Sequence, residues 1–164
     1  MPAADVRALL AAARARLTGA PREVLGQWAT PGRLFRRAPR ITPVGSAWRL
    51  GVLLLPAGTD DVLAVGEALR AEPEVRRGYT AVSARERAAT RGAAVRGGIA
   101  AGETVHVGWH RIDLDAVGRG EASGPLQLVD GIAMIQWTAG GGLMPLAAYL
   151  DERVVLLTDP STRA

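Results

Sequence analysis

Apolar side chains recur with a helical period near both ends of this 164-residue chain. Residues 3–18 place them in a narrow stripe, which predicts an amphipathic helix that Gly19 and Pro21 end. A second stripe follows Pro145, a residue type that suits the first position of a helix, and it predicts a last helix. The stripe residues are Val6, Leu9, Leu10, Ala13 and Leu17 near the start, and Leu146, Leu150, Val154 and Leu157 near the end.

Between these helices the pattern turns to strands. Residues 47–56 (AWRLGVLLLP) alternate at first and then become apolar on both faces, which is typical of a central strand. The loop AGTDD separates them from residues 62–71 (VLAVGEALRA), and the pair predicts a hairpin. Residues 62–71 also contain good helix formers, but Gly66 in mid-segment favours the strand.

A third helix is predicted over residues 83–98. Ser83 and Glu86 have the spacing of a capping box at its start, and Gly97 or Gly98 ends it. Small residues along this segment suit close packing against a sheet.

Three shorter patterns complete the expected elements. Residues 104–114 (TVHVGWHRIDL) alternate as a strand does, and a short helical turn is predicted over residues 22–27. In residues 126–137 (LQLVDGIAMIQW), Asp130-Gly131 between two apolar runs predicts a two-residue type I′ hairpin.

The order of these elements indicates an α+β fold. Because hairpins dominate, we expect a mainly antiparallel sheet of about five strands with three helices packed on it. The length suits one domain over residues 1–164, with residues 1–43 as a basic lead-in of helix and loop and residues 44–164 as the α+β core.

Composition narrows the class of protein. The chain has no cysteine, which excludes disulfides, thiolate zinc sites and cysteine nucleophiles and fits a reducing cytoplasm. No apolar run is long enough to span a bilayer, so we expect a soluble cytoplasmic protein that binds no membrane. Arg7, Arg14 and Arg16 interrupt the apolar N-terminal segment, which is unlike a signal peptide; they also resemble an organellar presequence, an alternative to the simple amphipathic helix.

The chain is arginine-rich and contains no lysine, and its positive charge is concentrated at the start. Residues 1–49 carry nine arginines against Asp5 and Glu23, whereas residues 50–124 and 125–164 are each slightly acidic. An asymmetry of this kind indicates an anionic partner.

The segment PGRLFRRAPRITPVG, residues 31–45, holds four of these arginines. Pro39 breaks the helical geometry that would align all four, so at most the first three share a turn. Planar guanidinium forks suit phosphate or carboxylate, and the alternative is an ordinary solvated loop. The predicted ligand-binding residues are Arg33, Arg36, Arg37 and Arg40.

His106 and His110 are candidate catalytic bases, with Asp113 or Asp115 to orient them. On one strand both histidines would point to the same side, about 13 Å apart, which is too far for one metal ion. We therefore expect no metal site, and the alternative to catalysis is a half-exposed strand. Because the chain has no nucleophile elbow, phosphate loop or dinucleotide fingerprint, we also expect no cofactor.

Several motifs resemble a set of small, functionally uncharacterised proteins of high-GC actinobacteria, some of which carry the label glutaminase. They are RRGYTAVSARERAA, RGG, GETVHVGW, DLDAV, SGPL, VDG and MPLAAYLDERVVLL, and the likeness covers nearly the whole chain from about Val44 onward. These motifs are structural, so the resemblance implies no activity. Serine-lysine glutaminases need a lysine and amidotransferase-type glutaminases need a cysteine, and both residue types are absent here.

These observations leave two function hypotheses. The first is a non-enzymatic domain that binds an anionic small molecule or a protein partner through its arginine-rich start. The second is a small hydrolase that acts on an amide. Nucleic acid is disfavoured as a partner because only Trp28, Phe35 and Trp48 could stack bases near the arginines.

Overall fold

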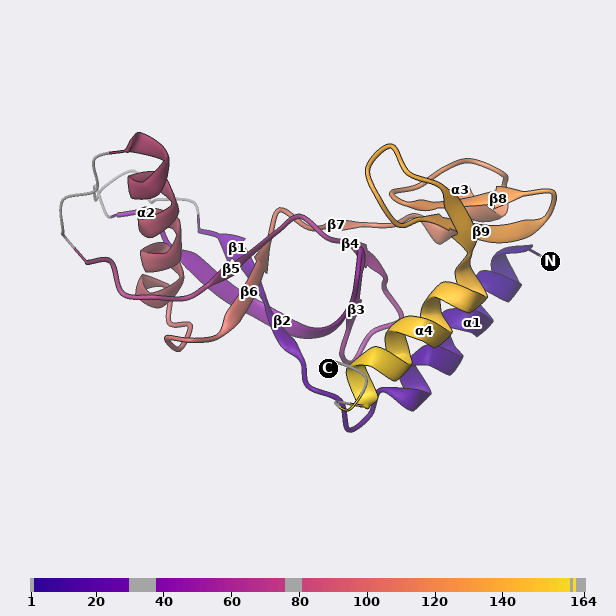
Figure 1. The fold of residues 1–164 in the computed structure, drawn as a ribbon, viewed down its shortest axis with the longest axis horizontal. Coiled ribbons are helices and arrows are strands. Elements are labelled where there is room, and N and C mark those ends of the chain that lie inside the picture. The colour runs from indigo at the N-terminus through magenta and orange to yellow at the C-terminus, as the bar shows by residue number, and fades with distance from the viewer. Residues whose placement is uncertain (1, 30–37, 76–80, 160, 162–164) are drawn as a thin grey trace. The chain divides into compact units, whose positions relative to one another are not determined.

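The computed structural model describes residues 2–29, 38–75, 81–159 and 161 (Figure 1). Within these ranges the chain forms four helices and ten strands. The helices are α1 (Pro2–Arg16), α2 (Val82–Arg96), α3 (Leu114–Gly118) and α4 (Leu146–Thr158). The strands are β1 (Glu23–Trp28), β2 (Ile41–Leu50), β3 (Leu53–Pro56), β4 (Leu63–Ala64), β5 (Glu67–Arg70), β6 (Thr104–Val107), β7 (His110–Arg111), β8 (Leu126–Val129), β9 (Ile132–Gln136) and β10 (Leu143–Pro145).

The predicted α+β class is confirmed, but the sheets differ in number and size from the prediction. Seven strands form a mixed sheet in the order β5-β6-β1-β2-β3-β4-β7, in which β1 and β6 run parallel. Three more strands form an antiparallel sheet in the order β10-β9-β8. The expectation of about five mainly antiparallel strands and three helices is corrected accordingly.

The chain folds into two compact units with interleaved segments. Unit 1 comprises Met1–Arg22, Trp48–Ala64 and His110–Ala164, and unit 2 comprises Glu23–Ala47 and Val65–Trp109. Each unit has a buried apolar cluster of its own. The expected lead-in, residues 1–43, contributes α1 to unit 1 and β1 with the start of β2 to unit 2. The assignment of one domain stays a prediction.

In unit 1, α1 and α4 lie side by side and bury the faces that the sequence predicts (Figure 1). Val6 and Leu10 of α1 and Leu146 and Leu150 of α4 join one cluster with residues of β3, β8 and β9. Figure 1 shows β8 and β9 together, and their Asp130-Gly131 hairpin is confirmed, with φ of 50° and 77° at the two turn residues. Strand β10 was not predicted, because it is short and follows a run of glycines.

In unit 2, α2 packs on one face of the sheet that contains β5, β6, β1 and β2. Ala93 and Ala94 of α2 are buried against Ile41 and Val105. Gly97 caps the helix C-terminus, as predicted, and a Cβ atom there would overlap the carbonyl of Ile41. The glycine therefore permits the close approach of the helix end to β2.

Two local predictions about helix starts are wrong. Strand β1, Glu23–Trp28, takes the place of the helical turn expected over residues 22–27, because β2 and β6 pair with it on both sides. The start of α2 is capped by Ala81 with no side-chain hydrogen bond, so Ser83 and Glu86 form no capping box. A single helical turn is costly to nucleate, and strand pairing outweighs it at residues 22–27.

Three predicted strands are each divided at a glycine. Residues 47–56, expected to form one central strand, turn at Gly51, with φ of 62°, between the end of β2 and β3. Gly108, with φ of 67°, separates β6 from β7 within the segment expected to be one strand. Near Gly66 the chain leaves β4 and enters β5, which pairs with β6. A Cβ atom on Gly66 would overlap the carbonyl of Val107, so this glycine allows a close backbone contact. The predicted hairpin is therefore confirmed only where β3 pairs with β4.

Among the helices of the described ranges, none has the length and apolar character needed to cross a membrane.

Candidate functional site

The structure places one of the four candidate ligand-binding arginines, Arg40. This residue is exposed and lies between Pro39 and β2, and its side chain bonds to no other residue in the described ranges. Its carbonyl accepts a hydrogen bond of 2.9 Å from the backbone N–H of Ala29, which closes the ladder between β1 and β2. Arg33, Arg36 and Arg37 lie outside the described residues.

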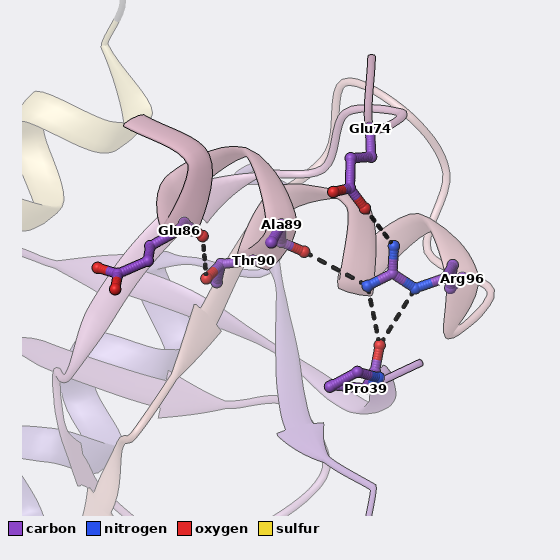
Figure 2. Close-up of polar contacts among 6 residues, drawn as sticks. All are labelled: Pro39, Glu74, Glu86, Ala89, Thr90 and Arg96. Atoms are coloured by element: carbon purple, nitrogen blue, oxygen red, sulfur yellow. Dashed lines mark hydrogen bonds and ion pairs between the residues drawn. The ribbon is translucent and has the colours of Figure 1, made fainter. Parts of the chain in front are cut away.

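The Arg96 side chain, at the end of α2, holds the segment next to Arg40 (Figure 2). Its Nε and Nη2 donate to the Pro39 carbonyl at 3.2 and 3.1 Å, and Nη1 donates to the Glu74 carboxylate at 2.9 Å. The guanidinium thereby connects residues 38–40, the segment around Glu74 and the helix end. Beside it lies a surface hollow of about 410 Å³ lined by Pro73, Glu74, Gly92, Val95 and Arg96.

Charge is divided unevenly between the two units. Unit 2 contains eleven arginines and six glutamates, whereas unit 1 contains nine arginines and ten acidic residues. Some unit 2 arginines are neutralised, since Arg91 pairs with Glu72 at 3.3 Å and Arg96 with Glu74. Others are exposed and have no side-chain partner within the described part of the chain: Arg40, Arg85 and Arg87. The described ranges hold six of these arginines and all six glutamates, so the excess of five arginines in unit 2 comes from residues outside the described ranges.

The candidate base His106 is buried, with 1% of its surface exposed. Its Nε2 hydrogen-bonds to the Glu23 carboxylate, which β1 brings alongside β6. Its Nδ1 is buried and bonds to no described residue. His106 is thus paired with Glu23 and not with Asp113 or Asp115, and in this position it does not reach a substrate in solvent.

His110 lies apart from this arrangement. The prediction that His106 and His110 share one strand is wrong, because the break at Gly108 places His106 on β6 in unit 2 and His110 on β7 in unit 1. His110 is exposed and stands opposite Ala64 in the β4–β7 pair. It makes no side-chain hydrogen bond to any residue in the described ranges.

Asp113 and Asp115 both lie at the start of α3 in unit 1. The Asp113 carboxylate accepts the backbone N–H groups of Ala116 and Asp115, at 2.9 and 3.0 Å. These bonds hold the pKa of Asp113 below its usual range, and the bond from Ala116 has the largest effect. Asp115 forms an exposed ion pair with Arg7 at 2.8 Å. The two carboxylates are therefore occupied in capping a helix and in an ion pair, and neither contacts a histidine.

A second hollow, of about 300 Å³, surrounds these two aspartates. Its other charged residues include Asp61, which pairs with Arg111 at 3.1 Å. Its two arginines pair with two of its four aspartates, Arg7 with Asp115 and Arg111 with Asp61, so the hollow keeps a net charge of about −2, which disfavours an anionic ligand. It is lined by Arg7, Asp60, Asp61, Val62, Arg111, Ile112, Asp113, Leu114 and Asp115.

The sequence did not identify Glu23 as the partner of His106, or Arg96 as the partner of Pro39 and Glu74. Glu23 lies 83 residues before His106, and only the parallel pairing of β1 with β6 brings them together. Arg96 reads as an ordinary last-turn arginine of a helix, and its role depends on where Pro39 and Glu74 lie. No local sequence pattern predicts either contact.

The structure is that of an α+β protein with two apolar cores, and it has no cluster of three or more metal-ligating side chains in the described ranges. No protein-family model matches the sequence, and no curated protein or solved structure matches it either. The site residues must therefore be interpreted from their own chemistry.

Proposed function

We propose that this protein binds an anionic small molecule, or an acidic segment of a protein partner, through the arginine surface of unit 2, without catalysing a reaction. The observation that carries the proposal is the charge of unit 2, eleven arginines against six glutamates. The binding residues proposed from the sequence are Arg33, Arg36, Arg37 and Arg40, all of which belong to this unit.

The state of the described arginines supports this assignment. Arg40, Arg85 and Arg87 are exposed, and no described carboxylate pairs with them. Guanidinium groups that are not already neutralised can form charge-assisted, bidentate hydrogen bonds to phosphate or carboxylate oxygens. The backbone next to Arg40 is fixed by the two bonds from Arg96 to the Pro39 carbonyl, so less freedom is lost when Arg40 binds a ligand.

The experiment is a thermal-shift titration of the purified full chain with tripolyphosphate, citrate and poly-glutamate. A ligand present at about 100 times its Kd stabilises the folded state by roughly 2.7 kcal/mol, which raises the melting temperature measurably. We expect such a shift with at least one of these probes. The shift should be lost in the triple variant Arg33→Gln, Arg36→Gln, Arg37→Gln and reduced in Arg40→Gln.

A matched control removes the same charge from unit 1. The variant Arg7→Gln, Arg111→Gln, Arg119→Gln also loses three positive charges, but each of these arginines is already paired with a unit 1 acid. Its shift should equal that of the wild type. An equal loss in both triple variants would mean that net charge alone attracts the anion, and no shift with any probe would overturn the proposal.

A further inference from the structure

The four tryptophans of the chain are of two kinds. Trp48 and Trp109 are partly buried, and the indole N–H of each donates to a backbone carbonyl, at 3.1 and 3.0 Å. Trp28 and Trp137 are 45% and 44% exposed, and their indole groups hydrogen-bond to no residue in the described ranges. A large ring that is exposed and has no internal hydrogen bond is available to a ligand. Trp28 belongs to unit 2 and Trp137 to unit 1.

Trp28 ends β1 and lies on the face of the sheet that α2 covers. Ile41, directly opposite Trp28 in the β1–β2 pair, is fully buried in the cluster that joins this sheet to α2. Residues that stand directly opposite share one face of a sheet, so the Trp28 side chain lies on the same face as Ile41. Pairing with β2 holds the backbone of Trp28, so the ring is presented from an ordered strand.

Arg40 lies at the same end of the β1–β2 ladder. The Ala29 N–H, one residue beyond Trp28, donates to the Arg40 carbonyl at 2.9 Å. Because paired strands lie only about 4.8 Å apart, one ligand can contact both side chains. Arg40 precedes β2, so the alternation of that strand does not fix the direction of its long side chain, which can turn towards the indole ring.

We propose that the anion bound by unit 2 is a nucleotide, whose base stacks on the Trp28 ring while its phosphates bind arginine. This inference rests on the proposed function and specifies the class of ligand. Stacking on an aromatic side chain is open to any base, because every base has a π-face. The Arg40 guanidinium suits the phosphate oxygens through bidentate, charge-assisted hydrogen bonds. The ring and the guanidinium thus match the two parts of a nucleotide, whereas an anion without a ring would use only the arginine.

A single exposed ring selects a mononucleotide over a nucleic-acid strand. Proteins that bind single strands present several aromatic rings, on which successive bases stack. Of the two aromatic residues that the structure describes in unit 2, Trp28 is exposed, and Trp109 is partly buried with its N–H bonded to Gly26. One exposed ring accommodates one base.

The test is isothermal titration calorimetry of the full chain with ATP and with tripolyphosphate. Tripolyphosphate carries at least as much negative charge as ATP, so charge alone does not favour the nucleotide. Stacking on one aromatic side chain should make ATP bind at least about 5-fold more tightly than tripolyphosphate. Arg40→Gln should weaken the binding of both ligands and leave this ratio unchanged, because it removes a phosphate contact and not the ring.

Substitutions at Trp28 separate the ring from the charge. Trp28→Leu should bind ATP and tripolyphosphate equally, with the wild-type affinity for tripolyphosphate, because it loses the stacking surface and keeps the arginines. Trp28→Phe keeps a smaller aromatic ring and should retain part of the preference for ATP. Trp137→Leu is the matched control, since it removes an equally exposed indole from unit 1 and should keep the full wild-type ratio.

Failure of this inference is distinguishable from failure of the proposed function. Binding of tripolyphosphate with ATP bound no more tightly would overturn the nucleotide and leave anion binding by unit 2 in place. A preference for ATP that persists in Trp28→Leu, or that is lost in Trp137→Leu, would overturn the role of Trp28. Binding of neither ligand would overturn the proposed function and this inference with it.

Discussion

In unit 1, a single buried polar group fixes the turn between β2 and β3. The Tyr149 hydroxyl donates to the Leu50 carbonyl and accepts from the Val52 N–H, both at 2.8 Å. It thereby holds the turn between β2 and β3 against α4. Gly51, with φ of 62°, lies so close to this hydroxyl that a Cβ atom would overlap it. A side chain of α4 thus determines the path of the chain about a hundred residues earlier.

The change Tyr149→Phe should therefore destabilise the protein. It leaves a carbonyl and an N–H of the turn without their partner, and an unsatisfied buried group costs about 1–3 kcal/mol of unfolding free energy. Urea denaturation followed by tryptophan fluorescence measures the loss. Val155→Ala on the same helix is the control, since it truncates a partly exposed apolar side chain and should cost less. A loss in Tyr149→Phe no larger than in this control would contradict the role assigned to the hydroxyl.

The His106–Glu23 pair predicts an asymmetry between two substitutions. Glu23→Ala leaves the buried imidazole without its carboxylate and should lower the unfolding free energy by about 1–3 kcal/mol. His106→Leu removes the buried polar ring, including an Nδ1 with no described partner, and inserts an apolar side chain of similar size. The Glu23 carboxylate that loses the imidazole is 32% exposed and can be solvated by water, so His106→Leu should cost less than Glu23→Ala. Denaturation curves of the two variants measure the difference, and a greater loss in His106→Leu would show that the imidazole itself is required.

Asp113 predicts a dependence of stability on pH. Its hydrogen bonds from Ala116 and Asp115 lower its pKa in the folded state. The stabilisation by this carboxylate is therefore complete above the pKa of an unfolded aspartate and is lost as pH falls through the lower, folded value. The melting temperature of Asp113→Ala should lie below that of the wild type at pH 6, and the two should converge as pH is lowered towards 2. Equal melting temperatures at pH 6 would contradict the capping role.

Among the elements, the hairpin of β8 and β9 depends on its two turn residues. Both Asp130 and Gly131 have positive φ, at 50° and 77°. Gly131→Ala should cost about 1 kcal/mol, because a Cβ atom disfavours this region. Asp130→Asn should have almost no effect, since asparagine also tolerates positive φ. Thermal unfolding of the two variants provides the comparison; equal stability of both would mean that the turn has another geometry in solution.

The sequence correctly predicts the elements that are determined by residues close together in the chain. The stripes of α1 and α4 and the turn at Asp130-Gly131 are complete within a dozen residues, and the structure confirms them. Residues 23–28 form β1 because β2 and β6 pair with them on either side, and a local pattern contains no information about these partners. The divisions at Gly66 and Gly108 likewise depend on close approach and positive φ, which the alternating pattern around them conceals.

At the scale of the whole molecule, the candidate site could also be predicted only where its cause is local in the sequence. The sequence identified the excess of arginine and the four residues from Arg33 to Arg40, but it could not assign charge to units whose segments are interleaved along the chain. The divided strand also separated His106 from His110 in a way that spacing alone could not reveal. Charge is additive along a sequence, whereas a catalytic arrangement requires specific distances, so a sequence alone supports a hypothesis of anion binding more readily than one of catalysis.

The division of charge leads to a last prediction about where an anion binds. Hydrogen exchange with and without tripolyphosphate should show slower exchange in peptides of unit 2, Glu23–Ala47 and Val65–Trp109, and unchanged exchange in peptides of unit 1. Because exposed charges are screened over about 10 Å at 0.1 M salt and about 3 Å at 1 M, the protection should disappear as sodium chloride is raised over that range. The variant Arg33→Gln, Arg36→Gln, Arg37→Gln should lose the protection at low salt as well. Protection that appears in unit 1, or that persists at high salt, would show that the anion is held by something other than the arginine surface of unit 2.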